Sequence, residues 1–430
     1  MQGRRLIVTG VLISLMMAVL SAAGMSAPAP AARDAVPGQY IVVFHDWVTE
    51  PATEALVVAN EHGLGILHTY EFALKGFAAT VPAARLARLL QDARVDFISE
   101  DRVVEITAQT LPTGVDRIEG EKSSTKSGDG TGRVNGAAVA IIDTGIDIDH
   151  PDLNVVGGKN CSTGRSYDDG NGHGTHVAGT VAAKDNTAGV VGVAPGAPLY
   201  AVRVLNNAGS GSWSSVICGV DWVTANAATK NIKVANMSLG GSGSDSSSDA
   251  NCNNANNDAL HKAICNSVKA GVTYVVAAGN SNTDFKGFVP AAYDEVLTVA
   301  AMADFNGRPG GGAPATCRSD VDDTAADFSN FTTIGSSDEG HTIAAPGVCI
   351  NSTWKGGGYN TISGTSMASP HVAGTAALCI AIAGQCAGLS PAQVMAKLRD
   401  DVVATYGFTD DPDTPNGNRY YGYLVYAGGY

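Results

Sequence analysis

The chain has 430 residues, of which 44% are hydrophobic and 16% are charged. This length leaves room for more than one domain, and the apolar fraction is that of a globular protein rather than a disordered one. The formal net charge of −14 argues against binding to nucleic acid or to anionic membranes, because phosphate groups attract basic surfaces.

The chain begins with the features of a secretion signal. Arg4 and Arg5 precede an apolar stretch over residues 6–20, and small residues follow at positions 21–23. This order of charge, apolar run and small residues is typical of a signal peptide. A retained membrane anchor is the alternative, but the stretch is short for a membrane span and no other long apolar run follows it. We therefore expect residues 1–23 to be a signal peptide and the protein to be secreted and extracellular.

The first folding unit is predicted between residues 40 and 105. Its apolar pattern and turn signals predict, in chain order, a strand, a helix, two strands, a helix and a strand. These elements cover residues 40–44, 54–61, 64–70, 76–81, 83–90 and 95–105. The order is the ferredoxin-like pattern, so we expect a small α+β unit. An independent binding module is one interpretation of it.

Beyond residue 108 the pattern changes to alternating strands and helices. Strands are predicted over residues 139–142, 199–204, 234–238, 274–277 and 296–300, and helices over residues 173–183, 214–227, 259–270 and 365–384. This alternation predicts an α/β fold with a doubly wound, mostly parallel sheet covered on both faces. Functional sites in such folds gather at the carboxyl ends of the strands. Residues 242–257 and 306–315 are rich in Ser, Asn or Gly and are predicted to be surface loops.

All eight cysteines lie in this second part of the chain. They are Cys161, Cys218, Cys252, Cys265, Cys317, Cys349, Cys379 and Cys386. An even number of cysteines in an exported protein predicts disulfides, and the absence of a Cys-x-x-Cys pair disfavours a metal site. Many pairings are open, and the closest pair in the sequence, Cys379 and Cys386, could staple the end of the last predicted helix.

Three polar motifs follow one another in the order acid, imidazole and hydroxyl. Asp143 ends a predicted buried strand in Asp-Thr-Gly, His173 begins a predicted helix in His-Gly-Thr-His, and Ser366 lies in Gly-Thr-Ser-Met-Ala-Ser-Pro at another helix start. A serine hydroxyl becomes a nucleophile when an imidazole takes its proton and a carboxylate orients that imidazole. Each motif alone has an ordinary reading as a turn, a capping histidine or an N-cap. Together they predict an activated serine.

The motifs and their order closely resemble those of the subtilisin-like serine proteases. The resemblance implies that Asp143, His173 and Ser366 are catalytic and that His176 is structural. It further implies that Asn280, which follows the buried run Val-Thr-Tyr-Val-Val-Ala-Ala-Gly, binds the oxyanion together with the backbone N–H of Ser366. The fold implied is the subtilisin-like α/β sheet, preceded by the small ferredoxin-like unit.

The same resemblance gives the first unit a role. Its Lys-Gly-Phe-Ala-Ala at residues 75–79, and its place before a protease, are similar to the inhibitor-type propeptides of subtilisins. This implies a propeptide over residues 24–107, with the folded inhibitor at roughly residues 38–106. Such a segment helps the enzyme to fold and then blocks its active site, so the chain's own propeptide is expected to be its inhibitor.

The start of the mature enzyme is implied in the same way. Residues 108–115, Ala-Gln-Thr-Leu-Pro-Thr-Gly-Val, resemble the first residues of mature subtilisins. We therefore expect autocatalytic cleavage between Thr107 and Ala108, which leaves a peptidase domain of residues 108–430.

The resemblance also implies which residues hold an extended peptide. Gly209-Ser210-Gly211 and Ser238-Leu239-Gly240 correspond to the two edges that bind the peptide main chain. Trp213, Val216 and Leu239 correspond to the walls of an apolar pocket for the fourth residue before the cleaved bond, although core packing is an alternative for Val216. The substrate-binding set is Gly209, Ser210, Gly211, Trp213, Ser238, Leu239, Gly240, Ala277 and Gly279. Residues 281–289, expected near the floor of the first pocket, are fewer than in familiar subtilisins, so the preference at the cleaved bond stays open.

A structural calcium ion is implied as the cofactor. Residues 184–190 have the length of the subtilisin calcium loop, and calcium takes oxygen ligands. The implied ligands are the side chains of Gln109, Asp152 and Asn186 and the main-chain carbonyls of Lys184, Ala188 and Val190. A solvated turn is the alternative. Ligands from three distant segments would tie the new amino terminus to the body of the enzyme.

The sequence thus predicts a secreted, calcium-stabilised serine endopeptidase that hydrolyses protein or peptide substrates through an acyl-enzyme on Ser366. Nothing in the sequence indicates an obligate partner, so we expect a monomer that binds neither nucleic acid nor membrane. An esterase is disfavoured because Gly-Thr-Ser-Met-Ala breaks the Gly-x-Ser-x-Gly elbow of α/β-hydrolases. A catalytically silent secreted binding protein is disfavoured because all four chemical residues are present.

Overall fold

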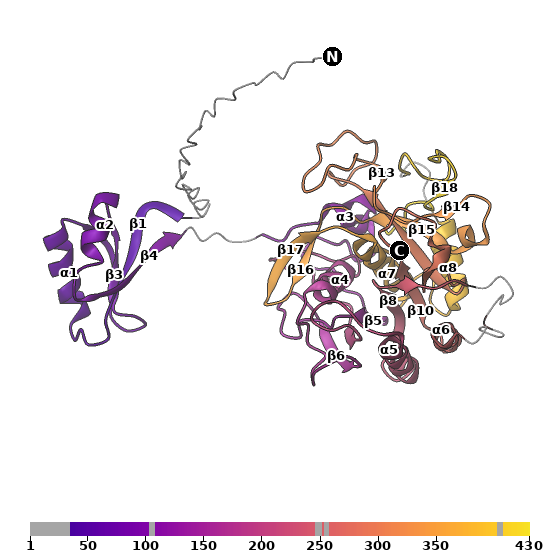
Figure 1. Ribbon diagram of the computed structural model, residues 1–430, viewed down its shortest axis with the longest axis horizontal. Coiled ribbons are helices and arrows are strands. Elements are labelled where there is room, and N and C mark those ends of the chain that lie inside the picture. Colours follow the sequence, from indigo (N-terminus) through magenta and orange to yellow (C-terminus); the bar gives the residue numbers. More distant parts are fainter. Residues whose placement is uncertain (1–34, 103–107, 246–251, 253–257, 402–406) are drawn as a thin grey trace, which may run out of the picture. The chain divides into compact units, whose positions relative to one another are not determined.

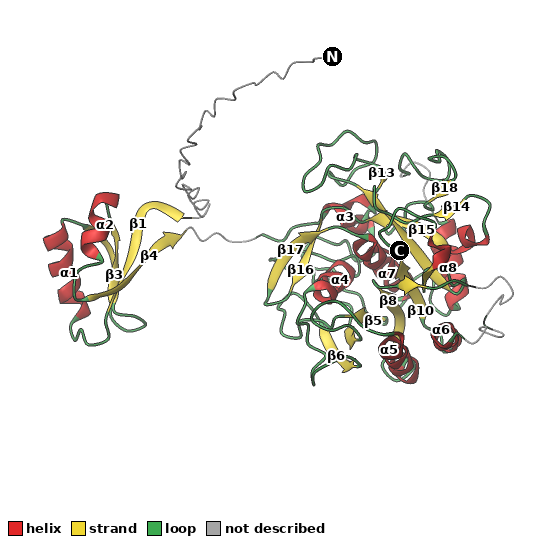
Figure 2. Cartoon of the chain, viewed as in Figure 1, coloured by secondary structure: helices red, strands yellow, loops and turns green. Residues whose placement is uncertain are grey.

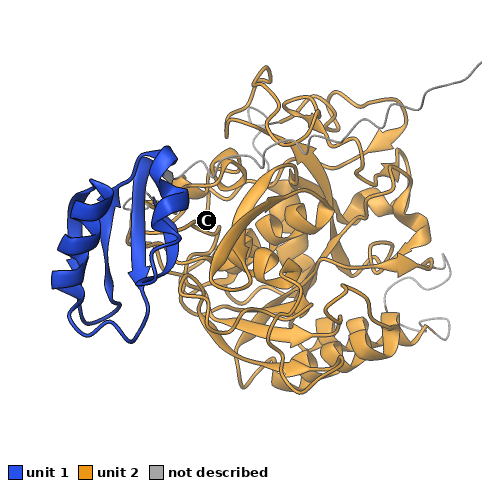
Figure 3. Ribbon diagram, turned by 60° about the vertical axis from the view of Figure 1, so that its left-hand side comes forward, with its two compact units in different colours: residues 1–106 blue, residues 107–430 orange. Residues whose placement is uncertain are grey.

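The computed structural model describes residues 35–102, 108–245, 252, 258–401 and 407–430 (Figure 1). The chain divides into two compact units, residues 1–106 and 107–430 (Figure 3). The signal peptide predicted for residues 1–23 lies outside the described residues. Within the described ranges, every helix is too short or too polar to cross a membrane.

Unit 1 is a four-stranded antiparallel sheet with two helices. Its elements are β1 Ala35–Phe44, α1 Pro51–His62, β2 Gly65–Tyr70, β3 Gly76–Thr80, α2 Ala83–Leu89 and β4 Val95–Arg102. The strand order β2-β3-β1-β4 is ferredoxin-like, as predicted. Val58 of α1 and Leu89 of α2 pack against Val42 and Phe77 of the sheet, so both helices cover the same face (Figure 1).

Unit 2 is built on an eight-stranded sheet. Its order is β13-β12-β10-β8-β5-β7-β6, with β15 paired to β12. The named pairs are parallel except β12 with β13. The sheet strands are β5 Ala138–Asp143, β6 Val155–Asn160, β7 Leu199–Arg203, β8 Ile232–Met237, β10 Thr273–Ala277, β12 Val296–Ala303, β13 Thr324–Ala325 and β15 Thr342–Pro346.

The remaining elements of unit 2 are helices and short ribbons. The helices are α3 Thr113–Arg117, α4 His173–Ala182, α5 Trp213–Asn226, α6 Ala259–Lys269, α7 Thr365–Ile380 and α8 Pro391–Asp400, with 3₁₀ turns η1 Gly120–Lys122, η2 Phe285–Gly287 and η3 Ser337–His341. The ribbons are β9 Gly241–Ser242 with β11 Phe288–Val289, β14 Thr332–Thr333 with β18 Arg419–Tyr420, and β16 Ile350–Trp354 with β17 Gly358–Ile362.

Helices cover both faces of this sheet (Figure 2). Along β5, Val139 and Ile141 belong to the core that includes α4 and α7, whereas Ala140 and Ile142 belong to the core that includes α5 and α6. A parallel strand buried on both faces reads as a continuous apolar run, which is what the sequence has at this position. The predicted doubly wound fold is therefore confirmed.

Helix α7 ends earlier than predicted, at Ile380 instead of Gly384. Cys379 and Cys386 form a disulfide with their Cα atoms 4.9 Å apart, whereas seven residues of helix span about 10.5 Å. The chain must therefore turn back after Ile380, and the N–H of Cys386 donates to the carbonyl of Cys379. The other disulfides join Cys161 to Cys218, Cys252 to Cys265 and Cys317 to Cys349, so the predicted disulfides are confirmed.

Candidate active site

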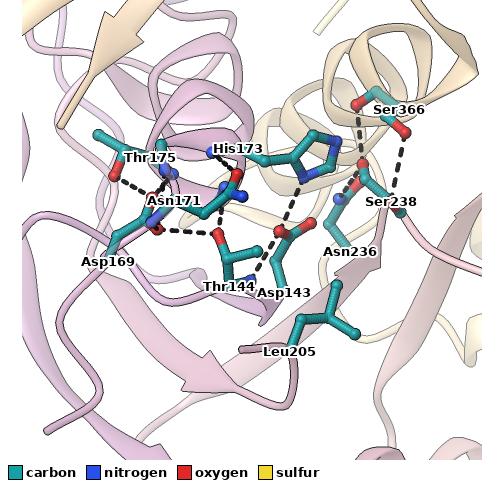
Figure 4. Close-up of polar contacts among 12 residues, drawn as sticks. Asp143, Thr144, Asp169, Asn171, His173, Thr175, Leu205, Asn236, Ser238 and Ser366 are labelled. Atoms are coloured by element: carbon teal, nitrogen blue, oxygen red, sulfur yellow. Dashed lines mark hydrogen bonds and ion pairs between the residues drawn. The ribbon is translucent and has the colours of Figure 1, made fainter. Parts of the chain in front are cut away.

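Asp143 and His173 meet at the carboxyl edge of the sheet. Asp143 is the last residue of β5 and His173 the first of α4. The Nδ1 atom of His173 lies 2.7 Å from Oδ1 of Asp143 (Figure 4). The carboxylate is fully buried, and the imidazole is 26% exposed. Burial disfavours the charged imidazole, but the charge of Asp143 and its hydrogen bond outweigh burial and raise the pKa of His173.

The loop before α4 is held by Asp169, which the sequence did not single out. Its carboxylate accepts hydrogen bonds from the hydroxyl of Thr144, from the N–H and hydroxyl of Thr175, and from backbone N–H groups of the turn between them (Figure 4). Thr144 Oγ1 in turn accepts the N–H of Gly174. Asp169 thereby fixes the start of α4 against the end of β5. Its only signal in the sequence was an Asp-Gly-Asn-Gly turn.

Ser366 lies at the amino-terminal end of α7, next to the end of β8. Its Oγ donates to the carbonyl of Ser238 at 3.2 Å, and Ser238 Oγ donates to the carbonyl of Ser366 at 2.8 Å (Figure 4). Asn236 supports this pair, because its Nδ2 donates to Ser238 Oγ. In this resting arrangement the hydroxyl of Ser366 is bound to a main-chain carbonyl.

Two N–H donors lie beside Gly364. A methyl group built on Gly364 would lie 3.5 Å from Nδ2 of Asn280, 3.7 Å from its Oδ1 and 3.6 Å from the backbone N of Ser366. The oxygen of the Asn280 amide is occupied elsewhere, since it accepts hydrogen bonds from the N–H and hydroxyl of Thr365. The amide nitrogen and the positive end of α7 can therefore stabilise a negative charge that develops between them.

A cavity of about 690 Å³ adjoins His173. It is lined by Thr144, Asn171, His173, Leu205, Gly209, Ser210, Gly211, Ser212, Trp213, Val216, Ser238, Leu239, Gly240 and Gly241. Seven residues of the predicted substrate-binding set are among these, whereas Ala277 and Gly279 lie outside the cavity lining, at the end of β10. Val216 is buried, with an exposed fraction of only 2%.

Comparison with known proteins identifies the family. Residues 134–423 match the sequence profile of the Subtilase family, and residues 39–107 match that of Peptidase inhibitor I9. The chain belongs to the subtilase family. It is a serine protease with an inhibitor-type propeptide domain, as predicted.

Several known proteases are similar to this subtilase over most of their length. It is 38% identical over 367 residues to the thermostable alkaline protease of Halalkalibacterium halodurans, which covers 85% of this chain and 88% of that protein. It is 38% identical over 410 residues to the extracellular serine proteinase of Thermus sp. strain Rt41A, with 86% and 89% covered. The crystal structure of a cold adapted subtilisin-like serine proteinase aligns with a TM-score of 0.54 at 33% identity, over 73% of this chain and 97% of that one.

His176 is distinct from His173 in its environment. Its ring is fully buried, and Nε2 lies 2.9 Å from the carbonyl of Ile350 and 3.1 Å from that of Asn360. Burial lowers the pKa of His176 to about 3, so the ring is neutral and donates to these carbonyls. It joins α4 to the β16–β17 ribbon.

The predicted calcium ligands converge beside the loop of residues 184–190. Gln109 Nε2 donates to the carbonyls of Lys184 and Val190 at 2.7 and 3.2 Å. Asn186 Nδ2 donates to Oδ1 of Asp152 at 2.7 Å. Two amide nitrogens thus bridge oxygens that come from separate segments of the subtilase.

This donor set fits calcium. The oxygens are two carbonyls and one carboxylate. Rotating the amides of Gln109 and Asn186 by 180° would turn their oxygens toward this set and would break the hydrogen bonds that these oxygens now accept from the N–H groups of Asn186 and Ala188. Burial, opposed by hydrogen bonds from Asn186 and Val190, raises the pKa of Asp152. The Nζ of Lys184 donates to the carbonyl of Pro151, so this hydrogen bond of the ammonium group is made outside the donor set.

The structure does not test the predicted roles of the Ala188 carbonyl and of Thr107. The hydrogen bond described for Ala188 uses its N–H, which donates to Oδ1 of Asn186 at 2.7 Å. Thr107 lies outside the described residues, and Ala108 is exposed.

Proposed function

We propose that this subtilase cleaves peptide bonds through an acyl-enzyme on Ser366, with His173 as proton acceptor and donor, Asp143 as its orienting carboxylate and Asn280 as oxyanion donor. The observation that carries this assignment is the 2.7 Å contact between His173 Nδ1 and the buried Asp143. It directs the other ring nitrogen, Nε2, away from the carboxylate and makes it the free base.

The reaction proceeds in two halves. The hydroxyl of Ser366 leaves the carbonyl of Ser238, turns to Nε2 of His173 and attacks the substrate carbonyl as His173 takes its proton. The oxyanion forms between Nδ2 of Asn280 and the N–H of Ser366. His173 then protonates the leaving amine, and water releases the acyl group by the reverse path.

Protein or peptide chains are the proposed substrates. An extended peptide would lie along Gly209-Ser210-Gly211 on one side and Ser238-Leu239-Gly240 on the other, as an added strand. Both segments line the cavity beside His173, which supports this arrangement. Trp213 and Leu239 would contact an apolar residue of the substrate.

The precursor would process itself. The signal peptide would comprise residues 1–23, the propeptide residues 24–107 and the peptidase domain residues 108–430. The match to Peptidase inhibitor I9 ends at Thr107, which supports cleavage between Thr107 and Ala108. The released propeptide would remain an inhibitor of the monomeric enzyme.

Calcium would stabilise the mature enzyme. The side chains of Gln109, Asp152 and Asn186 would hold it with the carbonyls of Lys184, Ala188 and Val190. When bound, the ion would supply a positive centre that neutralises the buried Asp152 and joins separate segments.

Secretion is supported by the N-terminal pattern and by a relative. The serine proteinase of Thermus sp. strain Rt41A is named as extracellular. The disulfides of unit 2 also fit an oxidising compartment.

A serine-directed phosphonate tests the catalytic assignment. The mature enzyme should take up one equivalent on Ser366, located by peptide mapping, and lose its ability to digest casein in proportion. His173→Ala should abolish both labelling and digestion. His176→Gln is the comparison variant at the neighbouring histidine, which has no catalytic role in this proposal. Labelling of another residue, or full activity of Ser366→Ala, would refute the assignment.

A further inference from the structure

A cluster of metal-binding side chains lies at the edge of the sheet opposite the candidate active site. Asp294 precedes β12, and Asp338 and His341 belong to η3, which precedes β15. Strands β12 and β15 are parallel neighbours, so the segments before them meet at the amino edge of the sheet. Asp143 ends β5 at the carboxyl edge. The cluster is therefore separate from the proposed catalytic residues.

Three ligand atoms converge in this cluster. Nε2 of His341 lies 3.7 Å from Oδ1 of Asp294 and 3.9 Å from Oδ1 of Asp338. One ligand atom from each residue lies within 4.8 Å of the other two. A tetrahedral zinc ion, with bonds of about 2.0–2.1 Å, holds its ligand atoms about 3.4 Å apart. The imidazole is thus within about half an ångström of the required separation from each carboxylate.

The imidazole of His341 is the observation that points to a ligand. Its side chain is only 3% exposed, yet neither ring nitrogen has a hydrogen-bond partner among the residues that the structure describes. A buried polar group without a hydrogen bond is unfavourable. Protonation alone does not supply one, because 3.7 and 3.9 Å are too long for hydrogen bonds to the carboxylates. A metal ion at Nε2 would satisfy the nitrogen that faces them.

The two carboxylates differ in their freedom to move. Asp338 is 15% exposed and accepts hydrogen bonds from the hydroxyls of Ser337 and Thr332, which orient it. Asp294 is 43% exposed, so its side chain can move toward Asp338 and close the gap between the two carboxylates. The same exposure lets an ion enter from solvent and lets water complete its coordination.

We propose that Asp294, Asp338 and His341 bind a transition-metal ion of the Zn²⁺ class in a structural site distinct from the calcium donor set. An imidazole nitrogen with carboxylate oxygens suits zinc, whereas calcium takes oxygen ligands alone. The ion joins the turn before β12 to η3 and thereby fixes the starts of two paired strands. Because it binds only the folded state, zinc should raise the Tm and leave the initial rate at low temperature unchanged.

Titration of the full chain with Co²⁺ tests this site. The precursor carries Ser366→Ala, which prevents self-digestion. Co²⁺ is the probe because it takes the ligands that zinc takes and absorbs visible light when they bind. In excess calcium, which fills the oxygen-only donor set, one equivalent of Co²⁺ should bind, and Zn²⁺ should displace it. Absence of Co²⁺ and Zn²⁺ binding in the presence of calcium would overturn the proposal.

Variants locate the ligands. His341→Gln and Asp294→Asn should each lower the affinity for Co²⁺ at least about tenfold, and the second substitution is at an exposed carboxylate that the fold does not need. His45→Gln is the matched control, because His45 lies 3.2 Å from the carboxylate of Asp96 but is 40% exposed. It should leave the affinity unchanged. Unchanged affinity in folded Asp294→Asn and Asp338→Asn, or an equal loss in His45→Gln, would overturn the assignment.

Discussion

The amide oxygen of Asn280 accepts two hydrogen bonds from Thr365, one from the N–H at 2.8 Å and one from the hydroxyl at 2.9 Å. The same hydroxyl accepts the N–H of Gly279 at 3.1 Å. Thr365 is fully buried and immediately precedes Ser366. One side chain thus orients the proposed oxyanion donor relative to the proposed nucleophile.

The hydroxyl of Thr365 should matter for turnover. Thr365→Val keeps the shape but leaves the Asn280 amide with one bond, and we expect kcat to fall about tenfold with a small change in KM. Asn280→Ala should cost more, about 10²–10³-fold in kcat, a range known from a subtilisin that lacks such a donor. Thr365→Ser should restore most of the activity. A Thr365→Val enzyme with an unchanged kcat would show that the hydroxyl does not position Asn280.

The pH profile should report the raised pKa of His173. The neutral imidazole is the active form, so kcat/KM should fall as the pH drops through a pKa above the ordinary value of 6.5. Asp143→Asn removes the interaction that opposes burial, so the acid limb should move to lower pH while kcat falls about 10⁴-fold. Asp149→Asn, at an exposed position, is the control. An acid limb that stays in place in Asp143→Asn would contradict this account.

Removal of calcium should lower the thermal stability of the mature enzyme rather than the rate of the reaction. An ion that binds only the folded state stabilises it by about 2.7 kcal/mol at a hundred times its dissociation constant. EDTA should therefore lower the Tm of the mature enzyme and leave its initial rate at low temperature nearly unchanged. Asn186→Ala should shrink the difference in Tm with and without calcium. Lys184→Ala keeps the main-chain carbonyl and should therefore retain this difference in Tm. An immediate loss of activity on chelation would instead show that the metal is catalytic.

Calcium affinity should weaken in acid. The pKa of Asp152 is raised by its burial, and the carboxylate must be ionised to hold the ion. Protons then compete with calcium as the pH falls through this raised pKa, which lies above the ordinary value of 3.8. Titration calorimetry at several pH values should show an increasing dissociation constant and proton release on binding. Affinity independent of pH would exclude Asp152 as a ligand.

Maturation should depend on Ser366. Ser366→Ala removes a small, partly exposed side chain, so we expect the precursor to fold and to remain uncut. SDS gel electrophoresis and N-terminal sequencing would follow cleavage at Thr107 in purified protein. Addition of a trace of active enzyme should restore processing. A variant that still cuts itself would disprove autoprocessing.

The five strands predicted from apolar runs are present as β5, β7, β8, β10 and β12, but β6 and the buried strand β15 were not predicted. The sequence of β6 is Val-Val-Gly-Gly-Lys-Asn, and glycines weaken a strand signal. A methyl group on Gly158 would lie 2.1 Å from the carbonyl oxygen of Ala201, so the pairing with β7 requires a residue without a side chain. Strand β6 forms because it pairs with β7, and a single sequence does not reveal that pairing.

Site residues that stand in a sequence motif could be predicted. Site residues whose hydrogen-bond partners are brought close only by the fold could not. Asp143, His173 and Ser366 stand in recognisable motifs. Asp169 and Asp185 do not, although the carboxylate of Asp185 accepts three backbone N–H groups from residues 128–132. Phe288 likewise lies beside Gly240 and Gly279, which are distant from each other in the sequence, so only the fold could indicate that they are neighbours.

The disulfides divide the precursor chemically into two parts. All four bonds join cysteines between Cys161 and Cys386, and no cysteine precedes Cys161 in the sequence. Cross-links stabilise a fold chiefly by restricting its unfolded chain, so thiol reduction weakens the peptidase unit and leaves the inhibitor unit unaffected. In a reducing compartment the peptidase unit therefore loses this stabilisation, whereas the inhibitor unit has no disulfide to lose.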